Sequence, residues 1–326
     1  MNGVFPRANT IVSIEESKLL KRFEYGLLFG AKGLDGALGV LNRMNYFRTY
    51  ETAAAPNFGE MLDDLIKDSF GLMYDVLPEK KVWKLFGLYY DIHNLKLAAK
   101  ERFLKKRLDG LYLDYGGYSM RTIRSAAVRE SDDILGDTAL TEGFFTALRA
   151  TDMHDIDFIL DKTYFAALKS AAERLGVPEI KIFVTERADL YNISVYFHSR
   201  AAGNPEGYFE KAFSDRGSFP LAEWQKYIGG EPENARSFPL WQKYEPLWKN
   251  AESGRRLFVE YDVMRDNYLV ERTKAAKLIA FGVLPICAYF FNRLIEIKNV
   301  RILLTGKQND YAEDEIAKRM RIPYEL

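Results

Sequence analysis

A short polar pattern that occurs three times constrains the fold of this 326-residue chain more than any other feature. Each copy reads acid, apolar residue, any residue, Asn, apolar residue, polar residue. The three acids are Asp91, Asp189 and Glu296. The three asparagines, which lie 98 and 107 residues apart, are Asn94, Asn192 and Asn299. One such hexapeptide carries little information, but three copies at nearly equal spacing predict a domain of about 100 residues repeated three times.

Each copy lies in a stretch with helical periodicity. In the third copy the pattern begins near Pro285, a favourable residue for a first helical turn, and Gly306 is the predicted stop. No stretch of the chain alternates convincingly between apolar and polar residues, as a half-buried strand would. We therefore predict an all-α protein of three helical bundles, with boundaries at residues 1–118, 119–215 and 216–326.

The acid and the Asn of each copy are three positions apart, so both face one side of a helix. Asn offers a donor and an acceptor, and can therefore bridge to the backbone at a neighbouring helix end. We interpret the pairs as polar clamps that fix helix register; a ligand site formed three times is the alternative. The repeated structural polar positions are Asp91, Asn94, Asp189, Asn192, Glu296, Asn299 and Arg301.

Charge and cysteine content narrow the classes of function. Lys plus Arg equals Asp plus Glu at 46 each, so no overall field attracts nucleic acid. Cys287 is the single cysteine and lies in an apolar run, which fits a buried thiol and a reducing cytoplasm. The longest apolar run, residues 278–291, falls short of the roughly 20 residues that a spanning helix needs. We expect a chain that does not cross a membrane by itself and begins without a signal peptide.

One stretch is strongly basic. The interval 100–107 carries five cations: Lys100, Arg102, Lys105, Lys106 and Arg107. One interpretation is a solvated helical face. The other is a contact with an acidic partner or with lipid headgroups.

The sequence contains no complete motif for binding a nucleotide phosphate or a metal ion. Thr305-Gly306-Lys307 resembles the end of a phosphate loop, but Arg301 occupies the position of the required first glycine. The histidines have no metal-binding spacing. They are His93, His154 and His198. The sequence therefore predicts no catalytic residue, no cofactor and no metal.

A second class of function remains open, that of all-α isoprenoid enzymes, which hold magnesium diphosphate with the motif D-D-x-x-D. Asp132-Asp133 begins such a motif, but Gly136 occupies the last position. Asp63-Asp64 fails in the same way, at Lys67. Helix capping and solvation explain these acids better. A helical adapter unrelated to any motor is a third alternative.

The C-terminal part of the chain resembles the C subunit of the prokaryotic V/A-type ATPase, which is related to the vacuolar ATPase d subunit. Tyr289 and the segment 296–307, with Glu296, Asn299, Arg301, Gly306 and Lys307, carry the resemblance. Asp91, Asn94 and Lys96 of the first copy and Ser17-Lys-Leu-Leu20 are similar too. The chain departs from the pattern in the second copy, where Ser194 replaces the basic residue.

This resemblance implies three similar bundles arranged as a funnel, on the cytoplasmic face of the membrane and peripheral to it. A protein of this kind contacts the proteolipid ring and receives the lower end of the central shaft, formed by D-type and F-type subunits. It passes torque between ATP hydrolysis or synthesis and proton or sodium transport, without being an enzyme itself. The five cations of residues 100–107 are then candidate contacts with the ring.

Overall fold

In the computed structural model, residues 5–47, 57–77, 80–129, 135–228, 237–248 and 257–324 are described, and every regular element among them is a helix. The all-α prediction is confirmed. The chain forms two compact units, Glu79–Lys249 and a second made of Asn2–Pro78 together with Asn250–Leu326.

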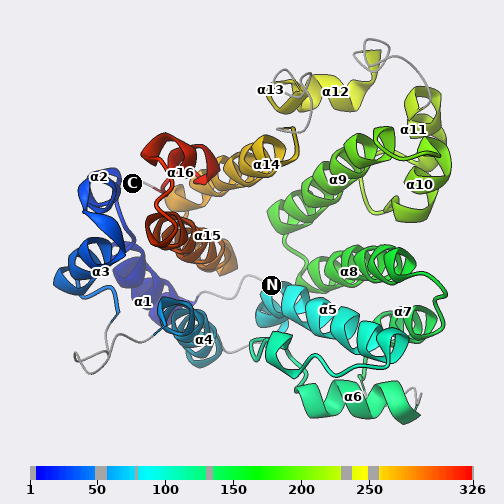
Figure 1. Cartoon of the computed structure of the whole chain (residues 1–326), viewed down its shortest axis with the longest axis horizontal. Coiled ribbons are helices and arrows are strands. Elements are labelled where there is room, and N and C mark those ends of the chain that lie inside the picture. The colour runs from blue at the N-terminus through cyan, green and yellow to red at the C-terminus, as the bar shows by residue number, and fades with distance from the viewer. Residues whose placement is uncertain are drawn as a thin grey trace. The chain divides into compact units, whose positions relative to one another are not determined.

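The second unit brings the two ends of the sequence together (Figure 1). Its helices are α1 (Pro6–Glu16), α2 (Arg22–Gly30), α3 (Gly33–Arg43), α4 (Phe58–Val76), α14 (Leu257–Thr273), the 3-10 helix η4 (Lys274–Leu278), α15 (Val283–Gln308) and α16 (Glu313–Arg319). Helix α15 packs against α3 and α4. Its residues Ile297, Val300 and Leu303 share one core with Leu28 and Leu62, so each end of the chain buries apolar surface on the other.

The unit Glu79–Lys249 is built on three long helices, α5, α8 and α9. Its elements are α5 (Lys80–Leu104), the 3-10 helix η1 (Asp109–Leu111), α6 (Met120–Arg129), α7 (Thr138–Leu148), α8 (Met153–Leu175), α9 (Pro178–Arg200), α10 (Pro205–Ala212), α11 (Leu221–Ile228), α12 (Pro239–Lys243) and α13 (Glu245–Trp248). Helix α8 packs against α5, α7 and α9.

Local signals explain how α8 begins and ends. The Asp152 carboxylate accepts a hydrogen bond from the His154 N–H and caps the first turn. Gly176 takes the left-handed conformation, with φ of 72°, and stops the helix. Pro178 then opens α9 at its first position, so the two long helices are joined by a tight connection.

Two details of the sequence prediction differ from the structure. Helix α15 continues past Gly306 to Gln308, so the predicted stop was wrong. A Cβ at Gly306 would lie 2.5 Å from Cγ1 of Ile316, and the glycine therefore permits the close approach of α16. The division at residues 118 and 215 stays a prediction; α5, placed in the first repeat, packs against α7 and α8, which the prediction places in the second.

Candidate functional site: three backbone clamps and a basic groove

Each Asn of the repeated pattern binds both backbone groups of a single residue in the chain that follows its helix. The side-chain amide donates to the carbonyl oxygen of that residue, and the side-chain oxygen accepts from its N–H. The residues held by Asn94, Asn192 and Asn299 are Leu113, Ser214 and Arg321. All six donor–acceptor distances lie between 2.7 and 3.0 Å. The bonds at Ser214 and Arg321 are fully buried, which makes the partners obligatory.

The acid of each copy accepts a further backbone N–H. Asp91 Oδ1 accepts from Tyr118 at 3.1 Å. Asp189 Oδ1 accepts from the Ser218 N–H at 2.6 Å, and its other oxygen accepts from the hydroxyl of Ser218. Glu296 accepts the N–H of Leu20, which lies 276 positions earlier in the chain. In the first two copies acid and Asn thus tie the helix to the chain that follows it, whereas in the third Glu296 holds Leu20 and Asn299 holds Arg321.

The surroundings of the three acids differ in charge. Glu296 is buried and forms an ion pair with Arg293, whose guanidinium stacks over the Tyr46 ring. Burial raises the pKa of Glu296, and Arg293 opposes this shift. Burial also raises the pKa of Asp91, to about 7, against hydrogen bonds from backbone N–H groups.

The second acid has yet another set of neighbours. Asp189 accepts a hydrogen bond from the Tyr244 hydroxyl at 3.1 Å and lies 3.6 Å from the Lys243 ammonium group. Both neighbours come from the α12 region, far along the chain. The repeated pattern therefore shares its backbone geometry and varies its partners.

The last position of the pattern joins neighbouring helices. Lys96 of α5 forms an ion pair with Asp161 of α8 at 2.7 Å. Arg301 of α15 forms one with Asp63 of α4 at 2.6 Å. In the second copy the shorter Ser194 lies 3.4 Å from His198 on its own helix instead. The departure of this copy from the pattern thus removes a link between helices.

The residues weighed for magnesium binding do not converge. Asp64 pairs with Lys67 on its own helix, while Asp63 pairs with Arg301. Asp137 caps α7 by accepting the Leu140 N–H. Asp132 and Asp133 lie outside the described residues. Within the described ranges, no three His, Cys, Asp or Glu side chains come together as metal ligands.

Lys307 and Cys287 are the two other residues that the sequence analysis singled out. The Lys307 ammonium group donates to the carbonyl oxygens of Phe29 and Ala31, where α2 ends. Cys287 is partly buried, and burial raises its pKa to about 12, which keeps the thiol protonated at neutral pH.

The five cations of residues 100–107 do not form one helical face. Lys100 is turned toward α8, where its ammonium group lies 2.9 Å from both carboxylate oxygens of Asp157. Helix α5 ends at Leu104, and Lys105 adopts a positive φ of 51°. Lys105, Lys106 and Arg107 therefore lie in the turn after the helix, apart from Lys100, which is paired with α8.

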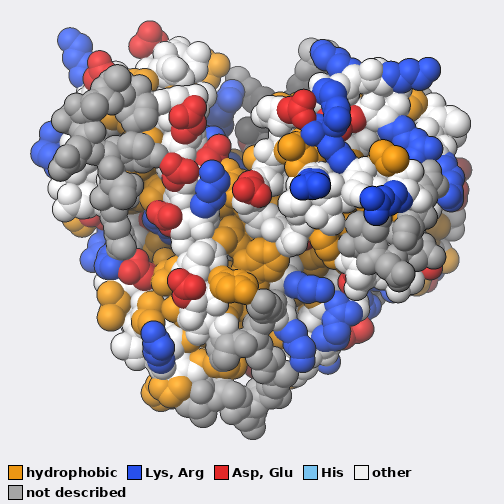
Figure 2. All heavy atoms as spheres, turned by 90° about the horizontal axis from the view of Figure 1, so that it is seen from below, with side chains coloured by type: hydrophobic (Ala, Val, Ile, Leu, Met, Phe, Trp, Pro, Cys, Tyr) orange, Lys and Arg blue, Asp and Glu red, His pale blue; other side chains and the backbone are white. Residues whose placement is uncertain are grey.

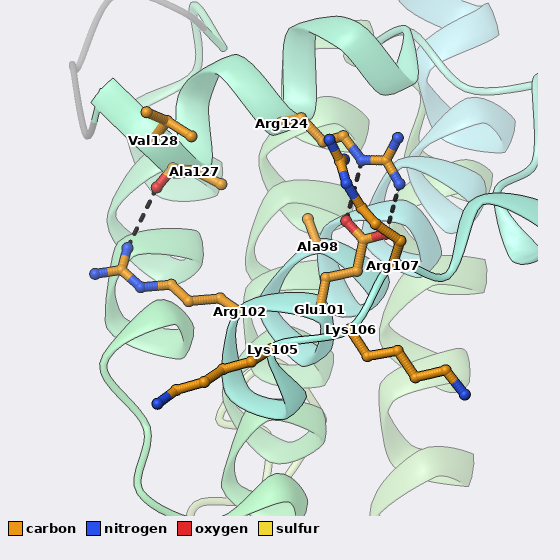
Figure 3. A pocket seen from close by; sticks show the side chains of 9 residues that line it. All are labelled: Ala98, Glu101, Arg102, Lys105, Lys106, Arg107, Arg124, Ala127 and Val128. Carbon is orange, nitrogen blue, oxygen red and sulfur yellow. Dashed lines mark hydrogen bonds and ion pairs between the residues drawn. The ribbon is translucent and has the colours of Figure 1, made fainter.

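These turn residues border a surface groove of about 560 Å³ between the end of α5 and α6 (Figure 3). Arg102 donates to the carbonyl oxygen of Ala127, and Arg124 donates to both oxygens of Glu101. The groove is lined by Ala98, Glu101, Arg102, Lys105, Lys106, Arg107, Arg124, Ala127 and Val128. The sequence analysis missed Arg124, whose proximity to the turn follows from the packing of α6 on α5.

The wider surface carries both signs of charge. Figure 2 shows Lys, Arg, Asp and Glu side chains distributed over one face together with apolar ones. Among the described residues, none of the helices combines the length and apolarity that a membrane span requires. The basic groove is thus a local feature on a chain of zero net charge.

Comparison with known proteins identifies the family. The sequence profile described as ATP synthase (C/AC39) subunit matches residues 8–319, nearly the whole chain. The chain belongs to this family. All three clamps lie inside the matched range, apart from the backbone of Arg321, which lies just beyond it.

Individual members of the ATP synthase (C/AC39) subunit family are similar along their length. The C subunit of the V-type sodium ATPase of Enterococcus hirae is 24% identical over 98% of this chain and 98% of that protein. The C subunit of the A-type ATP synthase of Methanocaldococcus jannaschii is 22% identical over 94% of this chain and 84% of that protein. The resemblance to the C subunit of V/A-type ATPases is therefore confirmed.

Proposed function

We propose that this chain is a non-catalytic central-stalk subunit of a V/A-type ATPase or ATP synthase. It links the rotary shaft, with its D-type and F-type subunits, to the proteolipid ring at the cytoplasmic face of the membrane. In this role it couples ATP hydrolysis or synthesis to proton or sodium transport. The observation that carries the proposal is the family match over residues 8–319 together with near-complete coverage of relatives that are named as C subunits.

The clamps support a mechanical role. A protein that passes torque must resist bending, and hydrogen bonds that are both buried and fully paired make a structure rigid. The long helices α5, α9 and α15 are each fixed at an acid and an Asn to backbone groups outside the helix, and the acid of α15 holds a segment 276 positions earlier in the chain. The ion pairs of Lys96 and Arg301 add links from α5 to α8 and from α15 to α4.

Recovery of the tagged full chain from gently solubilised membranes of its own cell tests the proposal. We expect about one copy per multi-copy proteolipid ring, together with the shaft and the ATPase head. A chain recovered alone, with no ring and no shaft, would overturn the rotor function. Binding of magnesium diphosphate by that free chain would then favour the isoprenoid alternative.

A further inference from the structure

The turn after α5 presents three cations that have no ionic partner among the described residues. No carboxylate of the described ranges pairs with the side chains of Lys105, Lys106 or Arg107, whereas nearby Lys96 and Lys100 are paired with α8. Figure 3 shows Lys105 and Lys106 extending in opposite directions from the turn. Unpaired cations at this density attract an anion that no part of the described chain supplies.

The one acid in the groove does not neutralise these cations. The Glu101 carboxylate accepts hydrogen bonds from the Leu108 N–H at 2.7 Å, from the Tyr112 hydroxyl at 3.0 Å and from Arg124. Arg124 also pairs with Asp109. Glu101 is therefore fully engaged in holding the wall of the groove together, and the charge of the turn stays positive.

Exposed apolar side chains lie beside the cations. Val128, which lines the groove from α6, is 84% exposed, and Phe103 and Leu104 on the last turn of α5 are 42% and 46% exposed. Cations next to exposed apolar groups suit the surface of an anionic bilayer, where phosphate meets the cations and apolar side chains reach the acyl boundary. A free phosphate ion, or a segment made of acidic residues alone, would satisfy the cations and leave these apolar groups in water.

We propose that the groove between the end of α5 and α6 binds phosphate headgroups of anionic phospholipids. Lys105, Lys106 and Arg107 contact the phosphates, and Val128, Phe103 and Leu104 enter the interface. The inference rests on the proposed function, since a protein seated on the proteolipid ring lies close to the bilayer. The proposed partner of Lys105, Lys106 and Arg107 is thus lipid, in place of the proteolipid ring that the family resemblance suggested.

Co-sedimentation of the full chain with vesicles tests this inference. Vesicles of phosphatidylcholine are compared with vesicles in which one third of the lipid is phosphatidylglycerol. We expect binding only to the latter, and a loss on the order of a hundredfold in the triple variant K105Q/K106Q/R107Q, because each cation near an anionic surface contributes about 1 kcal/mol. Val128→Ser should weaken binding severalfold.

A matched variant separates the groove from overall charge. The variant K67Q/K181Q/K226Q removes an equal number of positive charges from exposed positions elsewhere on the protein. It should bind vesicles as the natural chain does. Equal loss in both triple variants would overturn the proposal, as would no binding to phosphatidylglycerol. Displacement from vesicles by millimolar inorganic phosphate or by polyglutamate at low charge excess would instead identify a free phosphate or an acidic protein as the ligand.

The outcome is independent of the test of rotor function. A chain that recovers the ring and shaft but binds no phosphatidylglycerol vesicles retains its proposed function and loses the lipid site. A chain that binds the vesicles but recovers neither ring nor shaft loses the rotor function. Circular dichroism should show both triple variants folded, since all the substituted side chains are exposed.

Discussion

The third clamp differs from the first two in where its acid finds a donor. Asp91 and Asp189 accept N–H groups 27 and 29 positions later, in the turn that leads into α6 or α11. Glu296 accepts the N–H of Leu20, in the turn that leads into α2. The N-terminal segment thus takes the place in the third clamp that the following chain takes in the others.

The first two acids bind a nearby part of the chain, whereas the third binds a part that is far away in sequence. The first two clamps close loops of about thirty residues, which costs little chain entropy. In the third clamp Asn299 also closes a short loop, but Glu296 finds its partner only when segments from the two ends of the sequence meet, and the buried core of that unit is shared between the same ends. Because its acid is buried and is also paired with the partly buried Arg293, we expect breaking the third clamp to cost more stability.

The largest effect is expected for Glu296→Ala. The substitution leaves the Arg293 guanidinium and the Leu20 N–H without their partner, and we expect the free energy of unfolding to fall by about 4 kcal/mol. Asp91→Ala, which breaks no ion pair among the described residues, should cost about 2 kcal/mol. Urea denaturation followed by circular dichroism measures both.

Amide hydrogen exchange shows which part of the protein the Glu296→Ala substitution destabilises. Amides of residues 17–25 should exchange faster in Glu296→Ala, while amides near Ser218 keep their protection. Glu296→Gln retains an acceptor for Leu20 and should restore part of that protection. Unchanged exchange at residues 17–25 in Glu296→Ala would contradict the proposed closure by the N-terminal segment.

The loss of unfolding free energy on replacing each Asn by Ala should increase with the burial of the backbone groups that the Asn holds. Asn299→Ala leaves two buried groups of Arg321 unpaired, and we expect a loss of about 3 kcal/mol. At Asn94→Ala, water reaches the partly buried Leu113 and limits the loss to roughly 1 to 2 kcal/mol. Equal losses in urea denaturation would show that burial does not set the strength of the clamps.

Periodicity and the repeated pattern predicted much of this architecture. The helical class and the long helices around Asn94, Asn192 and Asn299 followed from residue spacing, whereas the family was indicated by the resemblance of the segment 296–307. The residues held by the clamps did not follow, because Leu113, Ser214 and Arg321 have no feature in common and are recognised through the backbone alone.

The basic groove was visible in sequence only as a run of charge. One of the two interpretations of this run is a helical face through residue 107, but α5 ends at Leu104 and Lys105 has a positive φ, which splits the run. Lys100 turns to Asp157, and Arg124 enters from α6. Both events depend on packing between helices, which periodicity within one helix does not encode.

A pH-dependent effect distinguishes Asp91 from its replacement by Asn. The native pKa of Asp91 is about 7, against roughly 3.9 in the unfolded chain. The folded state therefore holds a proton that the unfolded state releases, and this stability is present at low pH and lost as pH rises through 7. We expect the unfolding free energy of the natural chain, relative to Asp91→Asn, to fall by about 2 kcal/mol from pH 5 to pH 7.

The comparison between the two chains cancels all other titrating groups. Asn at position 91 still offers an oxygen to the Tyr118 N–H and carries no charge at any pH. Urea denaturation of both chains across this range gives the difference directly. A difference that does not change with pH would mean that Asp91 titrates alike in the folded and unfolded states.

The smallest effect concerns the glycines that let the first two acids approach the backbone. A Cβ at Gly217 would lie 2.7 Å from Asp189 Oδ1, so Gly217→Ala must move the carboxylate from the Ser218 N–H. We expect a loss of about 1 kcal/mol in unfolding free energy.

Gly203→Ala is the matched control, since nothing lies within 4 Å of its Cβ, and it should be neutral or slightly stabilising. In the third clamp Leu19 stands at the corresponding position, and we expect the longer glutamate side chain to reach the backbone N–H without so close an approach. If Gly217→Ala costs no more than Gly203→Ala, close approach does not explain why glycine accompanies aspartate in the first two clamps and is absent from the third.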